Sequence, residues 1–139
     1  MKSEDDLFWI KINGVTVGLT DDLYIGLSYV VPEESSRYIR NDENTFDRLI
    51  DSLAKSHQNT NSKCNIILCG DFNSRTATLA DSVPYDAVID ELGLPDDYIA
   101  DSFINRSSQD KGTTTNGQLF IDMCRQTGLR ILNGRVGND

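Results

Sequence analysis

The sequence predicts an α/β fold, a layered α+β sandwich with a mixed, mostly antiparallel sheet and flanking helices. Short apolar runs rich in β-branched residues, typical of strands, occur early, in the middle and late in the chain. Two other segments carry apolar residues at helical spacing. Alternation of such elements is typical of helices layered on a sheet. A chain of 139 residues can bury one core, so we expect a single domain over residues 1–139.

The first third of the chain predicts a sheet meander. Residues 7–12 form an apolar run that is typical of a strand, and Asn13 and Gly14 follow it as a strong short hairpin signal. Residues 15–19 are therefore the expected return strand. After a short acidic turn, residues 23–31 alternate in character as a third strand does, and a proline then ends the run.

A helix is predicted next, over residues 45–57, with Asn44 as its N-cap. Its apolar stripe has the spacing i, i+3, i+4 and i+7 and consists of Phe46, Leu49, Ile50 and Leu53. His57, the only histidine of the chain, falls near the C-terminal end, where a cationic side chain suits the helix dipole. A structural role is therefore favoured for His57 over a catalytic one.

Residues 65–75 are the part of the sequence that most favours a functional site. An apolar run at 66–69 predicts a buried strand that ends at Gly70, and polar side chains follow at Asp71, Asn73 and Ser74. Folds of the α/β class present chemistry at the carboxyl ends of their strands. The same residue types also form ordinary turns, so both interpretations are carried forward.

The second half of the chain is predicted in less detail. Residues 76–115 indicate a loop-rich crossover with solvated, scattered aspartates and a helical turn near residues 88–92. A second helix is expected from Asn116, its N-cap, to Gly128, its C-terminal stop. Its buried stripe is Leu119, Phe120, Met123 and Cys124. Residues 129–133 are the expected last strand.

Composition limits the partners. The net charge of −9 argues against broad electrostatic attraction to nucleic acid or anionic membrane, although a divalent metal in a site would offset it locally. The cysteines Cys64, Cys69 and Cys124 fit no zinc spacing, and the last two lie in apolar patterns typical of buried thiols. We expect a reducing, intracellular setting, nuclear or cytoplasmic, because the acidic N-terminus has no secretory signal pattern.

Residues 67–73, Ile-Leu-Cys-Gly-Asp-Phe-Asn, resemble the strand and GDFN motif of the endonuclease/exonuclease/phosphatase superfamily, the DNase I-like proteins. More narrowly, the chain resembles the endonuclease domain that non-LTR retrotransposons fuse to reverse transcriptase. The matching segments occur in the same order and are spread along nearly all of the chain: 9–12, 23–32, 70–75, 116–129 and 131–134. The resemblance implies a partial DNase I-like fold, DNA as substrate, Mg²⁺ or Mn²⁺ as cofactor, and a reverse transcriptase as fused or ancestral partner.

The resemblance also implies roles for individual residues. Asp71 would orient or deprotonate the attacking water, helped by a metal and by partial burial, and is itself a candidate metal ligand. Asn73 would donate its amide hydrogens to a phosphoryl oxygen. Tyr29 would point at the phosphate, with a core aromatic as the alternative. Ser74 and Arg75 would contact the substrate, with an ordinary solvent-exposed arginine as the alternative for Arg75.

The chain departs from this family at both ends. The family opens with strands that bring an asparagine and a metal-binding glutamate, and it closes with a strand that brings an Asp-His pair; no matching motif occurs here. We therefore expect a fragment with little or no nuclease activity alone. Strands missing from a sandwich leave exposed sheet edges and an apolar face, so we also expect a monomer that is marginal or that self-associates, in particular through sheet edges. Two alternatives stay open: a phosphatase of the same superfamily, and a non-catalytic remnant or interaction module.

Overall fold

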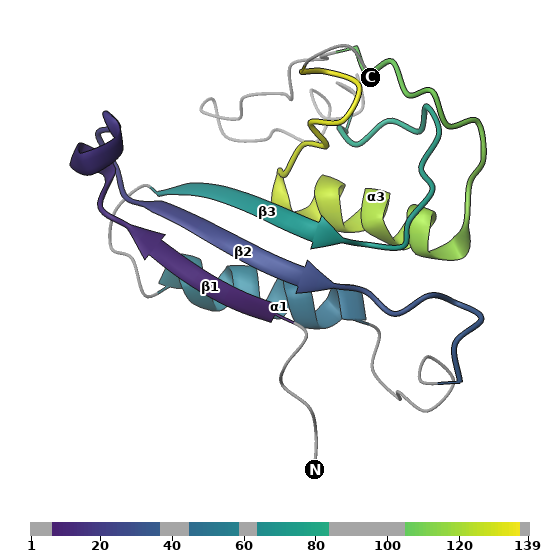
Figure 1. The fold of residues 1–139 in the computed structure, drawn as a ribbon, viewed down its shortest axis with the longest axis horizontal. Coiled ribbons are helices and arrows are strands. Elements are labelled where there is room, and N and C mark those ends of the chain that lie inside the picture. Colours follow the sequence, from purple (N-terminus) through teal and green to yellow (C-terminus); the bar gives the residue numbers. More distant parts are fainter. Residues whose placement is uncertain (1–6, 37–44, 59–63, 84–104, 137–139) are drawn as a thin grey trace, which may run out of the picture. The chain divides into compact units, whose positions relative to one another are not determined.

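The computed structural model is a small α/β domain with a three-stranded mixed sheet and two helices (Figure 1). The described residues are 7–36, 45–58, 64–83 and 105–136. The predicted α/β class is confirmed. The chain divides into two compact units, Met1–Ser74 and Arg75–Asp139, and each is described by itself; the single domain stays a prediction. Along the described residues, no helix has the length and apolar character that a membrane span requires.

The sheet belongs to the first unit and has the order β1 (Leu7–Ile12), β2 (Leu23–Tyr29), β3 (Asn65–Asp71). β1 pairs with β2 in antiparallel fashion, and β2 pairs with β3 in parallel. The sheet is thus mixed, as predicted, without an antiparallel majority among the described strands. The strand expected over residues 66–69 does not end at Gly70 as predicted, because the pairing of β3 with β2 continues through Asp71.

The connection between β1 and β2 corrects the predicted hairpin. It contains a 3₁₀ helix, η1 (Gly14–Val17), where a return strand was expected over residues 15–19. Asn13 has a φ of −62°, whereas the two-residue hairpin turn that Asn-Gly favours needs a positive φ there. Its side chain instead caps η1 by accepting a hydrogen bond from the Val15 N–H at 3.1 Å. The strand that returns along β1 is β2.

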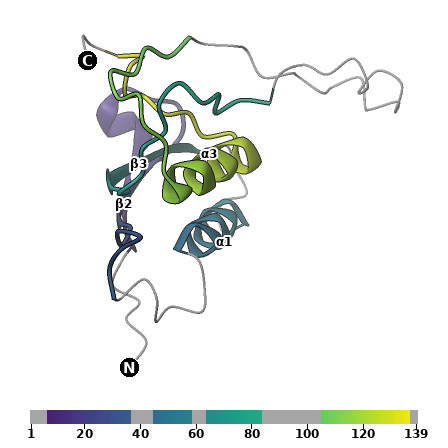
Figure 2. The same ribbon diagram turned by 90° about the vertical axis from the view of Figure 1, so that its right-hand side faces the viewer.

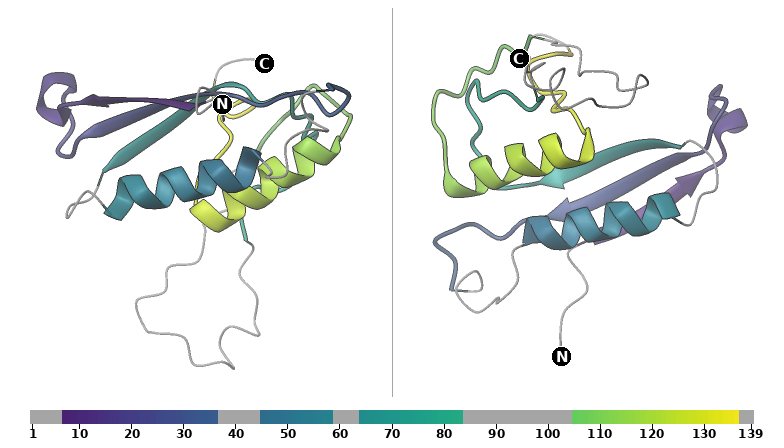
Figure 3. Two further views of the ribbon diagram at one scale, coloured as in Figure 1. Left: turned by 90° about the horizontal axis from the view of Figure 1, so that it is seen from below. Right: turned by 180° about the vertical axis from the view of Figure 1, so that it is seen from behind.

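Helix α1 (Thr45–Gln58) confirms the predicted amphipathic helix and extends it by one residue. It buries Phe46, Leu49 and Leu53, as the spacing predicts, whereas Ile50 of the predicted stripe is half-buried. The Trp9 indole N–H on β1 donates to the hydroxyl of Ser52 on α1 at 2.9 Å, so α1 covers the sheet face that carries Trp9. Figures 2 and 3 show α1 along that one side of the sheet. The predicted cap Asn44 lies outside the described residues.

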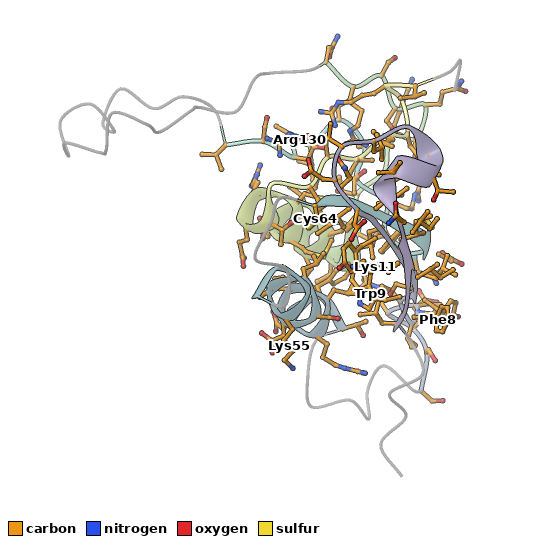
Figure 4. The ribbon with its side chains drawn as sticks, turned by 90° about the vertical axis from the view of Figure 1, so that its left-hand side faces the viewer. Phe8, Trp9, Lys11, Lys55, Cys64 and Arg130 are labelled. Carbon is orange, nitrogen blue, oxygen red and sulfur yellow. The ribbon has the colours of Figure 1, made fainter. Side chains whose placement is uncertain are left out.

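The opposite face of the sheet, here called the outer face, is apolar and exposed. Phe8 pairs with Leu27 and Ile10 with Ile25, and the parallel register adds β3 residues on the same side. Figure 4 shows Phe8 pointing away from α1, opposite to Trp9. Large side chains of this face retain 41–62% of their exposure: Phe8, Ile10, Leu27, Tyr29 and Ile67.

The second unit contains α3 (Thr115–Thr127). Its N-cap is Thr114, whose hydroxyl accepts a hydrogen bond from the Gly117 N–H at 3.1 Å. The expected cap, Asn116, is wrong, because this residue is buried inside the first turn. Gly128 ends the helix in the left-handed conformation, as predicted.

The buried stripe of α3 is confirmed only in part. Met123 and Cys124 are buried, whereas Leu119 and Phe120 are half-buried and Ile121 is buried in addition. Burial raises the pKa of the Cys124 thiol to about 12, which suits the predicted role of a small buried apolar residue. Cys69, predicted to be buried as well, is half-buried.

The expected last strand over residues 129–133 is wrong. The Ile131 N–H donates to the Asp81 carboxylate at 2.8 Å, and the Ile131 oxygen accepts from the Arg135 guanidinium at 2.8 Å. Side chains thus satisfy backbone groups that a strand would pair with a neighbour. In the predicted crossover, Thr76 forms an isolated bridge with Thr113. The helical turn expected near residues 88–92 lies outside the described residues.

Candidate functional site

The candidate site lies where β2 and β3 end. In a parallel pair the carboxyl ends meet at one edge of the sheet, and here Tyr29 stands opposite Asp71. The Val30 N–H donates to the main-chain oxygen of Asp71 at 2.8 Å, which continues the pairing past the last residue of β2. The register therefore fixes Tyr29 and Asp71 as neighbours on the same face of the sheet.

A tight turn after Asp71 places the asparagine of the motif. The Asn73 N–H donates to Asp71 Oδ1 at 3.0 Å, which is an Asx turn. Asn73 Nδ2 donates to the main-chain oxygen of Val30 at 2.7 Å, across to the segment that follows β2. Ser74 Oγ donates to the oxygen of Phe72 at 2.7 Å and closes the turn. These bonds hold Asp71 and Asn73 together at the sheet edge.

Gly70 is what lets the two strands approach here. Its φ is +140°, a conformation that residues with a side chain rarely adopt. A Cβ at this position would lie 1.8 Å from the main-chain oxygen of Ser28, far inside van der Waals contact. The sequence thus needs glycine directly before Asp71 for the carboxylate to stand beside Tyr29.

The groups that face solvent at this edge suit recognition of a phosphate ester. Asp71 is exposed, which corrects the expected partial burial, and its Oδ2 has no partner among the described residues. Asn73 is half-buried and uses one amide hydrogen on Val30, which leaves the second without a partner among those residues. Tyr29 is 45% exposed, so the core-aromatic alternative is wrong.

Arg75 begins the second unit and is engaged there. Its Nε and Nη2 donate to Asp110 at 2.9 and 2.7 Å, a two-pronged ion pair. The bond to Asp110 raises the pKa of Arg75 and, from the other side, lowers the pKa of Asp110 to about 2. Both side chains are substantially exposed. Arg75 is thus already paired with a carboxylate, while the other predicted site residues belong to the first unit.

A buried ion pair in the second unit was missed by the sequence analysis. Asp81, expected among solvated aspartates, is 1% exposed in its side chain and accepts from Arg135 Nη1 and Nη2 at 2.6 and 2.8 Å. Burial alone would raise the pKa of Asp81, but the bonds from Arg135 and from the Ile131 N–H outweigh it and hold the pKa at about 2. The partners are 54 residues apart, so no local spacing reveals them.

Two further arginines donate hydrogen bonds to the segment of residues 76–81. Arg106 donates to Thr76 Oγ1 at 2.9 Å and to the oxygen of Leu79 at 3.0 Å. Arg130 donates to the oxygen of Asp81 at 3.0 Å. These guanidinium groups bond to main-chain and hydroxyl oxygens, which favours a structural role for this cluster.

The donor set at the sheet edge can be compared with what a divalent cation needs. Mg²⁺ is commonly held by one or two carboxylates together with waters and substrate phosphate oxygens. Asp71 offers a solvent-facing carboxylate oxygen of this kind. Among the described residues, no group of three or more His, Cys, Asp or Glu side chains could hold a metal. Comparisons of the chain with protein-family models, with curated proteins and with solved structures found no match.

Proposed function

We propose that this chain carries part of the site of a metal-dependent phosphodiesterase, with DNA as substrate, of the DNase I-like kind found in retrotransposon proteins. The observation that supports it is the tie between the two strand ends, where Asn73 bonds to Val30 while Asp71 stands opposite Tyr29. An acceptor carboxylate and an amide donor at one strand edge are the groups that phosphodiester hydrolysis uses.

The geometry supports a proposed role for each residue. Asp71, with an oxygen open to solvent, would accept the proton of the attacking water or hold a divalent cation, which would stabilise charge on the leaving oxygen. Asn73 would donate its second amide hydrogen to a phosphoryl oxygen. Its first hydrogen bond, to Val30, fixes the direction of that donor before substrate arrives. Tyr29 would contact the phosphate from the neighbouring strand.

The test is a titration of the isotope-labelled chain with a dithymidine phosphodiester and Mg²⁺, followed by NMR. We expect shifts centred on the Asp71 amide and the Asn73 side-chain amide. Asp71→Asn keeps an oxygen for the Asx turn and removes the charge, so it should abolish the Mg²⁺-dependent shifts. Asp51→Asn, an exposed aspartate on α1, is the matched control and should change nothing. Shifts elsewhere, or none, would refute the proposal.

A phosphatase of the same superfamily is distinguished in the same experiment. A phosphatase site would prefer a phosphate monoester, with its additional negative charge, over the diester. We therefore expect thymidine monophosphate to shift the Asn73 side-chain amide less than the diester does at equal concentration. The opposite order would favour the phosphatase.

A further inference from the structure

The outer face of the sheet forms a continuous apolar surface that crosses all three described strands. Register places Phe8 beside Leu27, Ile25 beside Ile67, and Ile10 beside Ile25, so the exposed side chains adjoin one another. Phe8 is 62% exposed, more than any other large apolar residue of the sheet. α1 packs on the other face, through the Trp9–Ser52 bond. A contiguous apolar surface is often a binding site, whereas single exposed apolar side chains are ordinary on protein surfaces.

The size of the face suits the centre of a protein–protein interface. With a fully exposed large side chain taken as roughly 200 Å², exposures of 41–62% at its large residues leave roughly 500 Å² of apolar surface. A standard interface buries about 800 Å² on each partner, and homodimer interfaces are about 65% apolar. The outer face therefore has the area of the apolar centre of one such interface, with neighbouring polar groups as its rim.

The distribution of charge permits a second copy of the chain on the outer face. The chain carries a net charge of −9, so two copies repel each other over most of their surfaces. Along the outer face the register places a single ionisable carboxylate, Asp71, and it lies at the carboxyl edge of β3. Two copies can therefore meet face to face here without removing a cluster of charges from water.

We propose that the outer face is the interface of a homodimer, in which a second copy of this chain packs the same face about a two-fold axis. A two-fold interface uses the same patch on both partners, so a self-complementary apolar face is sufficient. This association goes through the face of the sheet and not through its edges, whereas the sequence led us to expect both an exposed apolar face and exposed edges. It does not depend on the proposed function. The outer face also carries Tyr29 and Asp71 of the candidate site, so the substitutions that test the interface are made at Phe8 and Ile67, which have no part in that site.

Sedimentation equilibrium over a range of chain concentrations tests the proposal. We expect a reversible dimer whose dissociation constant rises about tenfold or more in Phe8→Thr and in Ile67→Thr. Threonine removes the apolar surface and has the β-branched shape that strands favour. Val15→Thr is the matched control, because Val15 is 80% exposed in η1, away from the outer face, and should leave the constant unchanged.

Thiol labelling of the wild-type chain measures whether the same interface is covered in the dimer. Register places Cys69 beside Leu27 on the outer face, whereas Cys64 precedes β3. We expect the maleimide labelling rate of Cys69 to fall as the chain concentration rises, with a constant rate at Cys64. Phe8→Thr should remove this protection.

Three results would overturn the proposal. One is a monomer at about 100 μM, well above the micromolar constants of weak interfaces of this size. Another is a dimer that neither outer-face variant weakens. The third is an open, growing assembly with Cys69 labelled at the same rate at every concentration. If the chain is monomeric and a different protein binds the outer face, the homodimer proposal is likewise overturned.

Discussion

Asn73 donates its side-chain amide to the main-chain oxygen of Val30 at 2.7 Å while its own backbone adopts a φ of +44°. Asparagine tolerates this left-handed conformation better than most residues that carry a side chain. One residue thus joins the ends of β2 and β3 and turns the chain away from the sheet. Its role in holding the strands is separable from its proposed role as a phosphate donor.

Replacing Asn73 should reveal both contributions to stability. We expect Asn73→Ala to lower the free energy of unfolding by about 1–2 kcal/mol, through the lost hydrogen bond and the unfavourable φ. Asn73→Gly loses the bond but accepts the φ, so it should be less destabilised than Asn73→Ala. Urea denaturation followed by Trp9 fluorescence measures the difference. Equal losses in the two variants would show that the positive φ carries no cost.

Gly70 should tolerate no side chain. Gly70→Ala places a Cβ against the Ser28 oxygen and adds an unfavourable φ, so we expect a loss of roughly 3 kcal/mol or more, or failure to fold. Gly18→Ala is the control, since Gly18 also has a positive φ, of 76°, but no atom lies near its Cβ position. Its cost should be about 1–2 kcal/mol. Similar thermal melts for both variants would contradict the close approach.

Acid should lower the free energy of unfolding, because it protonates Asp81. Its pKa of about 2 in the folded chain lies below the ordinary value of 3.8, so the ionised form stabilises the fold above about pH 4. This contribution, on the order of 2 kcal/mol, is lost as the pH falls from 4 through 2. Unfolding free energies measured across this range should decline in the wild type. Asp81→Asn should flatten the part of the decline that Asp81 causes.

Breaking the same pair at neutral pH should be costly. Asp81→Asn removes the carboxylate that accepts two hydrogen bonds from the buried Arg135 guanidinium, for which we expect a loss of about 3–5 kcal/mol. Asp110→Asn breaks the exposed pair with Arg75 and should cost far less, because water solvates both groups there. Comparable losses in the two variants, by chemical denaturation, would show that burial does not decide the strength of these pairs.

Nicking of supercoiled plasmid in the presence of Mg²⁺ tests the proposed chemistry directly. The family that we propose for the chain also uses a metal-binding glutamate and a phosphate-binding histidine, for which this sequence has no matching motif. We therefore expect the chain alone to nick orders of magnitude more slowly than a DNase I-like enzyme with the full set. Any residual nicking should disappear in Asp71→Asn and persist in Asp51→Asn. Rates near those of such an enzyme would refute this expectation.

The sequence predicted best what depends on neighbours in the chain. The spacing of Phe46, Leu49 and Leu53 gave α1 nearly to the residue, because a helix buries a stripe set by its own period. The apolar runs located all three described strands, because a strand is also recognised from residues that are neighbours in the chain. For the candidate site, the sequence indicated the turn after β3, whereas the bond from Asn73 to Val30 depends on strand pairing.

Errors arose where distant groups or a second local use of the same residues decided the structure. Asn13 and Gly14 are as suitable for capping a 3₁₀ turn as for a tight hairpin, and the bond from the Gly14 N–H to Asp22 favours the former. Residues 129–133 have the composition of a strand, but Asp81 satisfies the backbone at Ile131 from far away in the sequence. No periodic pattern in the sequence reveals a hydrogen bond between residues so far apart.

The parallel pairing of β2 and β3 also has a consequence for the order in which the chain folds. β1 and β2 are joined by a short connection, whereas β2 and β3 are separated by residues 30–64, which include α1. Closing the longer loop costs more entropy before any contact repays it, so the parallel pair should form later. Tyr29 and Asp71 meet only in that step, and a nascent chain that has formed only the antiparallel pair would therefore still lack the candidate site.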